Sequence, residues 1–295
     1  MMKIEPMHER LSATPMHGDA SGASIGRLLL DSGRISVADA ERVLQLQREE
    51  GIRFGEAAVK LGLVGEEDIR QALSRQFDYP YLAPGEGKVS AELIAAYQPF
   101  STPVEGLRAL RTQLMLRWFG TGQRALALLG MKDGDGCSFH AANLAVVFSQ
   151  LGQRTLLIDA NLRTPRQHQI FNLGNQAGLS ELLSGRADEQ VVTRIENFVD
   201  LSVLTAGAPP PNPMELLARG TLRQWLDGFG ARYEVIVIDT PPVSQCADSQ
   251  TVAVHAGGAL LIARQNHTDL AGLTKLKAEL TQARVNIVGA VLNRH

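Results

Sequence analysis

The residues with the clearest capacity for chemistry lie in one glycine-rich stretch, GMKDGDGCSFHAANLA at positions 130–145. Phosphate-binding loops have the pattern G-x-x-x-x-G-K-[ST] between a strand and a helix, with backbone N–H groups around the phosphates and the hydroxyl on magnesium. Ser138 supplies that hydroxyl here, but Cys137 stands in the lysine position. The residues that we predict to contact a nucleotide are Gly134, Asp135, Gly136, Cys137, Ser138 and Phe139. A tight strand-to-helix connection without a ligand is the alternative that this stretch leaves open.

Two carboxylates end apolar strands farther along the chain. The segment TLLIDANLRTPRQH ends a strand with Asp159, and YEVIVIDTPP ends another with Asp239. A carboxylate at such a strand end can hold magnesium, directly or through water, although isolated acids also serve as helix caps or turn residues. The glycine-rich loop, Asp159 and Asp239 each follow a predicted strand, and three such positions in one chain favour a single ligand site. We therefore predict that Ser138, Asp159 and Asp239 hold Mg²⁺.

A regular alternation of strands and helices positions these residues. From about Glu105 onward, apolar strands alternate with helical stretches, and the strands include RALALLG, TLLIDA, LSVLTAG, YEVIVID and GALLIAR. Strands that are apolar along their whole length are typical of a mostly parallel sheet with helices on both faces. Such sheets bind ligands at the carboxyl ends of their strands. The predicted fold class is therefore α/β, of the P-loop NTPase type.

A different organisation precedes this domain. Residues 1–23 are polar and carry Pro, Gly and Ser, which predicts a disordered leader. Residues 24–47 and 53–76 align without gaps, and each repeat predicts a helix, a turn and a second helix. Two repeats are too few for a solenoid, so we expect one compact helical domain. The predicted boundaries are 24–82 for the helical two-repeat domain, 83–104 for a linker and 105–295 for the α/β domain.

Composition and charge exclude several classes of protein. The chain has 295 residues, 29 of them Lys or Arg and 31 Asp or Glu, and the net charge of -2 gives no electrostatic reason to expect nucleic acid as a partner. The two cysteines, Cys137 and Cys246, come without a signal peptide or an apolar run near 18 residues. We expect a reduced cytoplasmic protein that reaches a membrane only through a partner.

Residues 100–295 resemble the bacterial tyrosine kinases of capsule and exopolysaccharide operons, which are relatives of the MinD and ParA ATPases. The motifs that carry the resemblance are the loop ending in AANLA, the segment LLIDANLR, and IDTPPV followed by Asp248. The resemblance implies that the chain binds ATP and Mg²⁺ and transfers the γ-phosphoryl group to a tyrosine on a partner. It also implies that Asn293 in VLNR contacts the nucleotide base.

A further motif of the same family implies contact between subunits. The segment EGLRALR fits the element E-x-x-R-x-x-R, which implicates Glu105, Arg108 and Arg111 in a homo-oligomer. The alternative is a solvated helix face with weak ion pairs between residues three positions apart.

The helical repeat resembles the N-terminal domain of type II secretion and pilus ATPases, which in some members binds cyclic di-GMP. Binding members open each unit with Arg-Leu-Gly; here the second unit opens RFG at Arg53, whereas the first opens SIG at Ser24. A cyclic di-GMP site at Arg53 and a docking module without nucleotide both stay open. Together the two halves resemble the EpsG type of exopolysaccharide chain-length-determinant tyrosine kinase. This implies a cytoplasmic protein, held peripherally at the inner membrane by a membrane-embedded polysaccharide chain-length regulator.

Three departures from the family bear on activity. Cys137 cannot supply the fixed positive charge of a loop lysine, and Asn161 replaces a second acid, so that Asp159 remains as the candidate catalytic residue. Relatives that phosphorylate themselves end in a tyrosine cluster, whereas this sequence ends in VLNRH and its tyrosines are Tyr79, Tyr81, Tyr97 and Tyr233. Three hypotheses follow: a kinase-like regulator of chain length with a degenerate loop, an inactive pseudokinase scaffold, and a cyclic di-GMP-responsive subunit.

Overall fold

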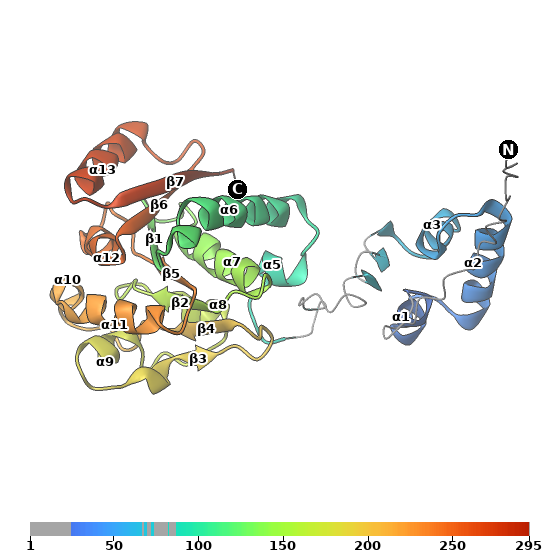
Figure 1. Ribbon diagram of the computed structural model, residues 1–295, viewed down its shortest axis with the longest axis horizontal. Helices are drawn as coiled ribbons and strands as arrows, with labels where there is room; N and C mark the ends of the chain where they lie inside the picture. Colours follow the sequence, from blue (N-terminus) through green and yellow to red (C-terminus); the bar gives the residue numbers. More distant parts are fainter. Residues whose placement is uncertain (1–24, 67, 70–71, 74–81, 83–86, 295) are drawn as a thin grey trace, which may run out of the picture. The chain divides into compact units, whose positions relative to one another are not determined.

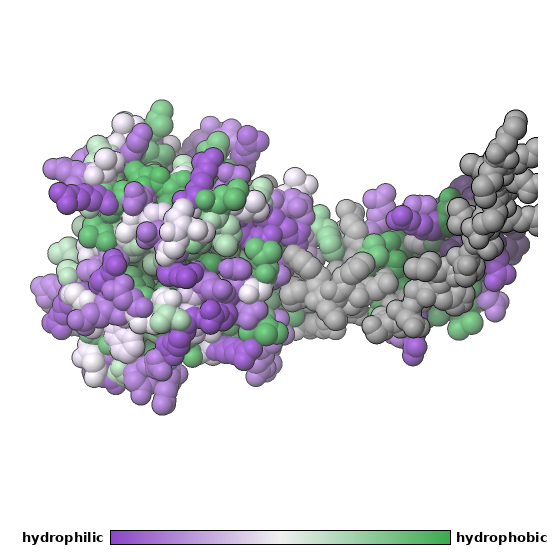
Figure 2. All heavy atoms as spheres, viewed as in Figure 1, coloured by the Kyte–Doolittle hydropathy of each residue, from purple (hydrophilic) through white to green (hydrophobic). Residues whose placement is uncertain are grey.

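The computed structural model describes residues 25–66, 68–69, 72–73, 82 and 87–294. The chain divides into two compact units, Met1–Tyr79 and Pro80–His295. The leader predicted for residues 1–23 lies outside the described residues. On the face of the second unit shown in Figure 2, hydrophilic side chains surround smaller hydrophobic areas, as on ordinary globular domains. Among the described helices, none is both long enough and apolar enough to cross a bilayer.

The first unit is helical in its described part. Its helices include α1 (Ile25–Asp31), α2 (Val37–Glu50) and α3 (Phe54–Lys60) (Figure 1). Ser36 and Asp39 form a capping box at the start of α2, in which each side chain accepts the other residue's N–H at 3.1 Å. Gly33 and Gly62, one in each repeat, both have a φ of 67°, a left-handed conformation that glycine adopts without strain. The same turn therefore ends the first helix of each repeat.

The second unit contains a seven-stranded sheet in the order β3-β4-β2-β5-β1-β6-β7. Its strands are β1 (Ala125–Gly130), β2 (Thr155–Asp159), β3 (Thr193–Arg194), β4 (Leu201–Leu204), β5 (Val235–Asp239), β6 (Gly258–Arg264) and β7 (Asn286–Asn293). All neighbouring strands run parallel except β3 and β4 at one edge. This sheet confirms the predicted α/β fold class.

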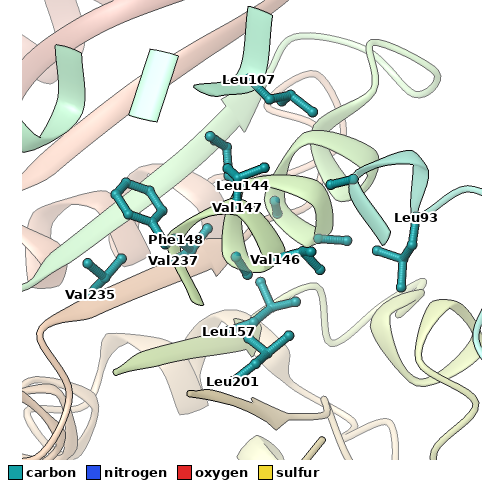
Figure 3. Close-up of a cluster of buried hydrophobic side chains, with 14 of the residues drawn as sticks. Leu93, Leu107, Leu144, Val146, Val147, Phe148, Leu157, Leu201, Val235 and Val237 are labelled. Carbon is teal, nitrogen blue, oxygen red and sulfur yellow. The ribbon is translucent and has the colours of Figure 1, made fainter. Parts of the chain in front are cut away.

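Helices cover both faces of the sheet (Figure 1). The helices and 3-10 turns of this unit are α5 (Ile94–Tyr97), α6 (Thr102–Arg117), η1 (Phe119–Thr121), α7 (Cys137–Ser149), α8 (Gln167–Ile170), α9 (Leu179–Leu183), η2 (Glu189–Val191), α10 (Pro213–Ala218), α11 (Thr221–Gly230), α12 (Asp248–Ala256) and α13 (Leu270–Gln282). On one face, Leu157 and Val237 share a buried cluster with Phe148 of α7 (Figure 3). The next residues along the same strands, Ile158 and Ile238, belong to the cluster on the opposite face. Because side chains alternate between faces, the central strands have to be apolar at every position.

Part of the segment expected as a linker belongs to the core of the second unit. The sequence predicts a linker over 83–104, but Leu93 and Ala95 are fully buried in the structure. The Asn143 side chain of α7 accepts from the Ala95 N–H and donates to the Glu92 carbonyl, each at 2.9 Å. The partners lie 48 and 51 positions apart in the sequence, so the irregular local pattern of the segment does not reveal this packing.

Candidate functional site

The glycine-rich loop joins β1 to α7 at the carboxyl edge of the sheet. Gly134 has a φ of 81° and Gly136 a φ of 96°, conformations that residues with a Cβ rarely adopt. A Cβ on Gly136 would also lie 2.7 Å from the side-chain nitrogen of Asn293 and would have to displace that side chain. The loop borders a cavity of about 420 Å³, whose wall also includes Ser138, Phe139, Asn161, Arg166 and Thr240. The predicted phosphate-binding loop therefore faces a concave site.

The Asp135 side chain supports the loop from inside. It is buried, its Oδ1 accepts from the Thr268 hydroxyl at 2.8 Å and lies 2.9 Å from His267 Nδ1, and its Oδ2 accepts from the Lys132 N–H at 2.8 Å. Only the backbone of Asp135 is left for the predicted contact with a nucleotide. The sequence analysis missed His267 and Thr268, because they lie 132 and 133 positions away and carry no local motif.

Asn293 reaches the loop from the end of β7. Its side-chain Nδ2 donates to the Asp135 carbonyl at 3.2 Å. A second cavity, of about 740 Å³, opens beside it, and its wall includes Leu107, Leu110, Phe139, His140 and Asn293. The structure therefore brings the predicted base-contacting residue next to the loop and to an apolar cavity.

Cys137 occupies the first position of α7 with its thiol turned toward β1. Its Sγ donates to the Leu128 carbonyl at 3.2 Å. Burial, together with the nearby Asp239 carboxylate, raises the pKa of the Cys137 thiol well above its ordinary value. The thiol is therefore neutral at physiological pH, and it provides no positive charge for a phosphate.

The two predicted carboxylates lie directly opposite each other at the ends of β2 and β5, where Asp159 pairs in register with Asp239. Both are fully buried. Asp159 Oδ1 accepts from the Asn161 N–H at 3.1 Å, and its Oδ2 accepts from the N–H groups of Arg166 and Gln167 at 3.0 and 2.9 Å. Asp239 Oδ2 accepts from Gln167 Nε2 at 2.7 Å, whereas Asp239 Oδ1 has no hydrogen-bond partner among the described residues.

Burial disfavours the charged forms of both Asp159 and Asp239. Burial raises the pKa of Asp159 to about 8, and repulsion from Asp239 adds to the effect. Burial also raises the pKa of Asp239 to about 6, against hydrogen bonds from Gln167 and Ser138 that lower it. The described residues contain no cluster of three or more His, Cys, Asp or Glu side chains that could hold a metal by themselves. The residues present fit a divalent cation that takes further oxygen ligands from the Ser138 hydroxyl and from a bound phosphate.

Asn161, which replaces a family acid, is engaged in a local turn. Its side-chain Nδ2 donates to the Thr164 carbonyl at 2.9 Å, and its Oδ1 accepts from the Thr164 N–H at 3.0 Å. An aspartate could accept from the same N–H, but its second oxygen would face the Thr164 carbonyl and be repelled. Within this turn, Arg163 forms an ion pair of 2.8 Å with the fully buried Asp248, which follows the IDTPPV segment.

The residues predicted to join subunits lie on α6. Glu105 and Arg108 form an ion pair with each other, and Arg111 Nη1 donates to the Val147 carbonyl of α7 at 2.6 Å. Their role in a homo-oligomer stays a prediction. Arg53 lies in the other compact unit, at the start of α3, where its backbone N–H donates to the Glu56 carboxylate at 3.2 Å.

No protein-family model matches this chain. The chain is 36% identical over 200 residues to the tyrosine-protein kinase etk of Escherichia coli strain K12, a match that covers 68% of this chain but only 28% of that protein. It is also 36% identical over 200 residues to the putative tyrosine-protein kinase CapB of Staphylococcus aureus, with 67% of this chain and 86% of CapB covered. The chain belongs to the bacterial tyrosine-protein kinase family. The predicted resemblance is thereby confirmed at the level of this family.

Solved structures show the same relationship. The chimerical protein CapA2B2 is 32% identical with a TM-score of 0.66, over 76% of this chain and 98% of that chain. The cell division ATPase MinD of Pyrococcus furiosus is 24% identical with a TM-score of 0.51, over 58% of this chain and 72% of that chain, and it shares the fold. The predicted P-loop fold of the MinD and ParA type is therefore confirmed.

Proposed function

We propose that this chain is a kinase-like regulator of exopolysaccharide polymerisation and export that binds Mg²⁺ and ATP. The observation that carries the proposal is the pair of buried carboxylates, Asp159 and Asp239, beside the glycine loop and Ser138. Two adjacent buried acids raise the free energy of the folded protein unless protons or a cation neutralise them. A magnesium ion bound together with a nucleotide supplies that positive charge.

The two cavities accommodate different parts of the nucleotide in this proposal. Backbone N–H groups of residues 134–138 bind the phosphates in the smaller cavity, and Asn293 contacts the base in the larger one. Ser138, Asp159 and Asp239 hold the magnesium ion. Asp159, with its raised pKa, takes the catalytic role when a phosphoryl group passes to a tyrosine of a partner.

The cellular role rests on the resemblance to the EpsG type of chain-length-determinant kinase. In this role the chain works in the cytoplasm and binds a membrane-embedded chain-length regulator, which holds it at the inner membrane and uses it to control polymer length. Glu105, Arg108 and Arg111 join its subunits. The helical unit, predicted over 24–82, docks a partner; binding of cyclic di-GMP at Arg53 is a separate prediction, tested by titrating the dinucleotide against Arg53→Ala.

A pseudokinase scaffold is the second candidate, and two observations favour it. The Cys137 thiol is neutral and bonded to the Leu128 carbonyl, so the loop offers the outer phosphates no charged side chain at this position. The Asn161 side-chain amide forms its hydrogen bonds with the Thr164 backbone and not with the site. Both features lower phosphoryl transfer more than they lower binding, because the lost charges act most strongly on the transition state.

Calorimetric titration of the full chain with ATP tests the proposal. We expect micromolar binding in Mg²⁺, weaker but measurable binding in EDTA and in Asp239→Asn, and no change in Asp227→Asn, which removes an exposed acid from α11. If only Cys137→Lys binds ATP, the scaffold candidate is correct. If neither wild type nor Cys137→Lys binds, nucleotide binding is not a function of this chain. Where wild type binds, transfer of phosphate to the purified membrane partner separates an active kinase from a nucleotide-binding scaffold.

A further inference from the structure

Gln167, the first residue of α8, is fully buried and bonds to three separate parts of the site. Its backbone N–H donates to Asp159 Oδ2 at 2.9 Å. Its side-chain Nε2 donates to Asp239 Oδ2 at 2.7 Å and to the Ser138 carbonyl at 3.1 Å. A single residue therefore connects the ends of β2 and β5 to the first turn of α7.

The chemistry of its neighbours determines how the Gln167 amide is oriented. A carboxylate oxygen and a carbonyl oxygen both accept hydrogen bonds, so the amide nitrogen has to face them. The amide oxygen, Oε1, therefore points elsewhere, and it has no hydrogen-bond partner among the described residues. Asp239 Oδ1 is also buried and also has no hydrogen-bond partner among the described residues. Buried acceptors without a donor are unfavourable, and two of them beside one hydrogen bond indicate a position for a cation or its bound water.

The missing loop lysine makes this amide more important. Cys137 provides no charge beside Asp239, and Arg166, which follows Asp159 in the turn, directs its guanidinium to Glu92 at 2.7 Å. The hydrogen bonds that hold the Asp239 carboxylate therefore come from neutral donors, and the first of these is the Gln167 side chain, followed by the Ser138 hydroxyl.

We propose that Gln167 is a positioning residue of the magnesium site, whose side-chain amide holds Asp239 and Ser138 in the geometry that binds the ion. This inference rests on the proposed function of the same site. Gln167 is not a catalytic residue, because it is fully buried and its contacts are with the protein.

Two substitutions separate the effect of the side-chain hydrogen bonds of Gln167 from the effect of its volume. Gln167→Leu removes the side-chain donors, keeps the backbone N–H that donates to Asp159, and has a similar size. Gln167→Glu keeps the shape but sets a carboxylate oxygen against Asp239 Oδ2 and the Ser138 carbonyl. Gln282→Leu is the matched control, because Gln282 is exposed at the end of α13, which leads to the start of β7 and thus to the opposite edge of the sheet.

The test titrates Mg²⁺ into the full chain at a fixed concentration of ADP and, separately, ADP in EDTA. Gln167→Leu should raise the half-saturating Mg²⁺ concentration at least about tenfold, the effect of losing one hydrogen bond to a charged group. Gln167→Glu should raise it further. The affinity for ADP in EDTA should change less than about twofold, since the loop backbone is intact. Gln282→Leu should match wild type in both titrations.

Two results would overturn the inference. One is an unchanged half-saturating Mg²⁺ concentration in Gln167→Leu. The other is an equal loss of ADP affinity in EDTA, which would mean that the substitution disturbs the fold in general. If wild type binds no ADP at any Mg²⁺ concentration, the proposed function fails. Crystal structures of wild type and Gln167→Leu then decide the positioning role: an Asp239 carboxylate turned away from Ser138 supports it, and an unmoved carboxylate refutes it.

Discussion

Replacing Asp239 with asparagine isolates the free-energy cost of the buried carboxylate pair. An asparagine oxygen can accept the bond that Gln167 now donates to Asp239 Oδ2, and the amide nitrogen takes the place of Oδ1, which has no partner in the described part of the chain. The substitution therefore removes a charge without removing a hydrogen bond. The same change at Asp159 is less clean, because both of its oxygens accept backbone N–H groups.

The expected magnitude follows from the raised pKa values. Folding raises the pKa of Asp239 from 3.8 to about 6 and that of Asp159 from 3.8 to about 8. An acid whose pKa is higher in the folded state gives its full stability below the unfolded pKa and loses it as pH rises to the folded value. Each pH unit in that window costs about 1.4 kcal/mol per acid. Asp239 alone therefore costs up to about 3 kcal/mol by pH 6, and Asp159 continues the loss toward pH 8.

We therefore predict that Asp239→Asn gains stability relative to wild type as pH rises from 4 to 6, and that it keeps this advantage at pH 7.5. Urea unfolding in EDTA, followed by tryptophan fluorescence, measures the difference. The two tryptophans of the sequence, Trp118 and Trp225, both lie in the second unit, so the signal reports the unfolding of that unit. The exposed-acid variant Asp227→Asn should show no such trend. A difference that is constant with pH, or that grows toward low pH, would refute the reasoning.

Three further predictions address the loop and the helix behind it. Cys137→Lys should raise the affinity for Mg-ADP about tenfold to a hundredfold by adding a charge-assisted contact, while Gln282→Lys, with the same charge far from the loop, should not; calorimetry compares them. Gly136→Ala should abolish ADP binding at unchanged helix content by circular dichroism, because a φ of 96° strains a residue with a Cβ and the added Cβ would displace the Asn293 side chain. Asn143→Leu should lower the unfolding free energy by about 2–4 kcal/mol in urea, since it leaves the buried Ala95 N–H and the half-buried Glu92 carbonyl without their partner.

Each of these predictions has a contradicting outcome. Equal gains in Cys137→Lys and Gln282→Lys would indicate a long-range charge effect rather than a contact in the loop. Wild-type affinity in Gly136→Ala would mean that the loop does not hold the nucleotide. Unchanged stability in Asn143→Leu would mean that the segment before α6 is not held by this side chain.

Several features of this protein can be predicted from the sequence because they depend on local chemistry. Strands buried on both faces have to be apolar throughout, so β2 and β5 are visible as continuous runs that end in Asp159 and Asp239. Carboxyl ends of parallel strands lie at one edge of a sheet, which is why the two acids were expected together. Left-handed backbone favours glycine, so Gly134 and Gly136 mark the loop.

Other features were decided only by the tertiary structure, since they depend on contacts between distant parts of the chain. Gln167 lies in an ordinary polar stretch, and its importance comes from bonds to residues 29 and 72 positions away. His267 shows no motif, yet it supports the loop through the buried side chain of Asp135. The burial of Leu93, Ala95 and Ala96 depends on Asn143 in the same way. Local periodicity in the sequence shows which way a side chain faces, but not which residues it contacts. The side-chain donor to the buried Asp239 comes from a distant part of the chain, so only the tertiary structure reveals it.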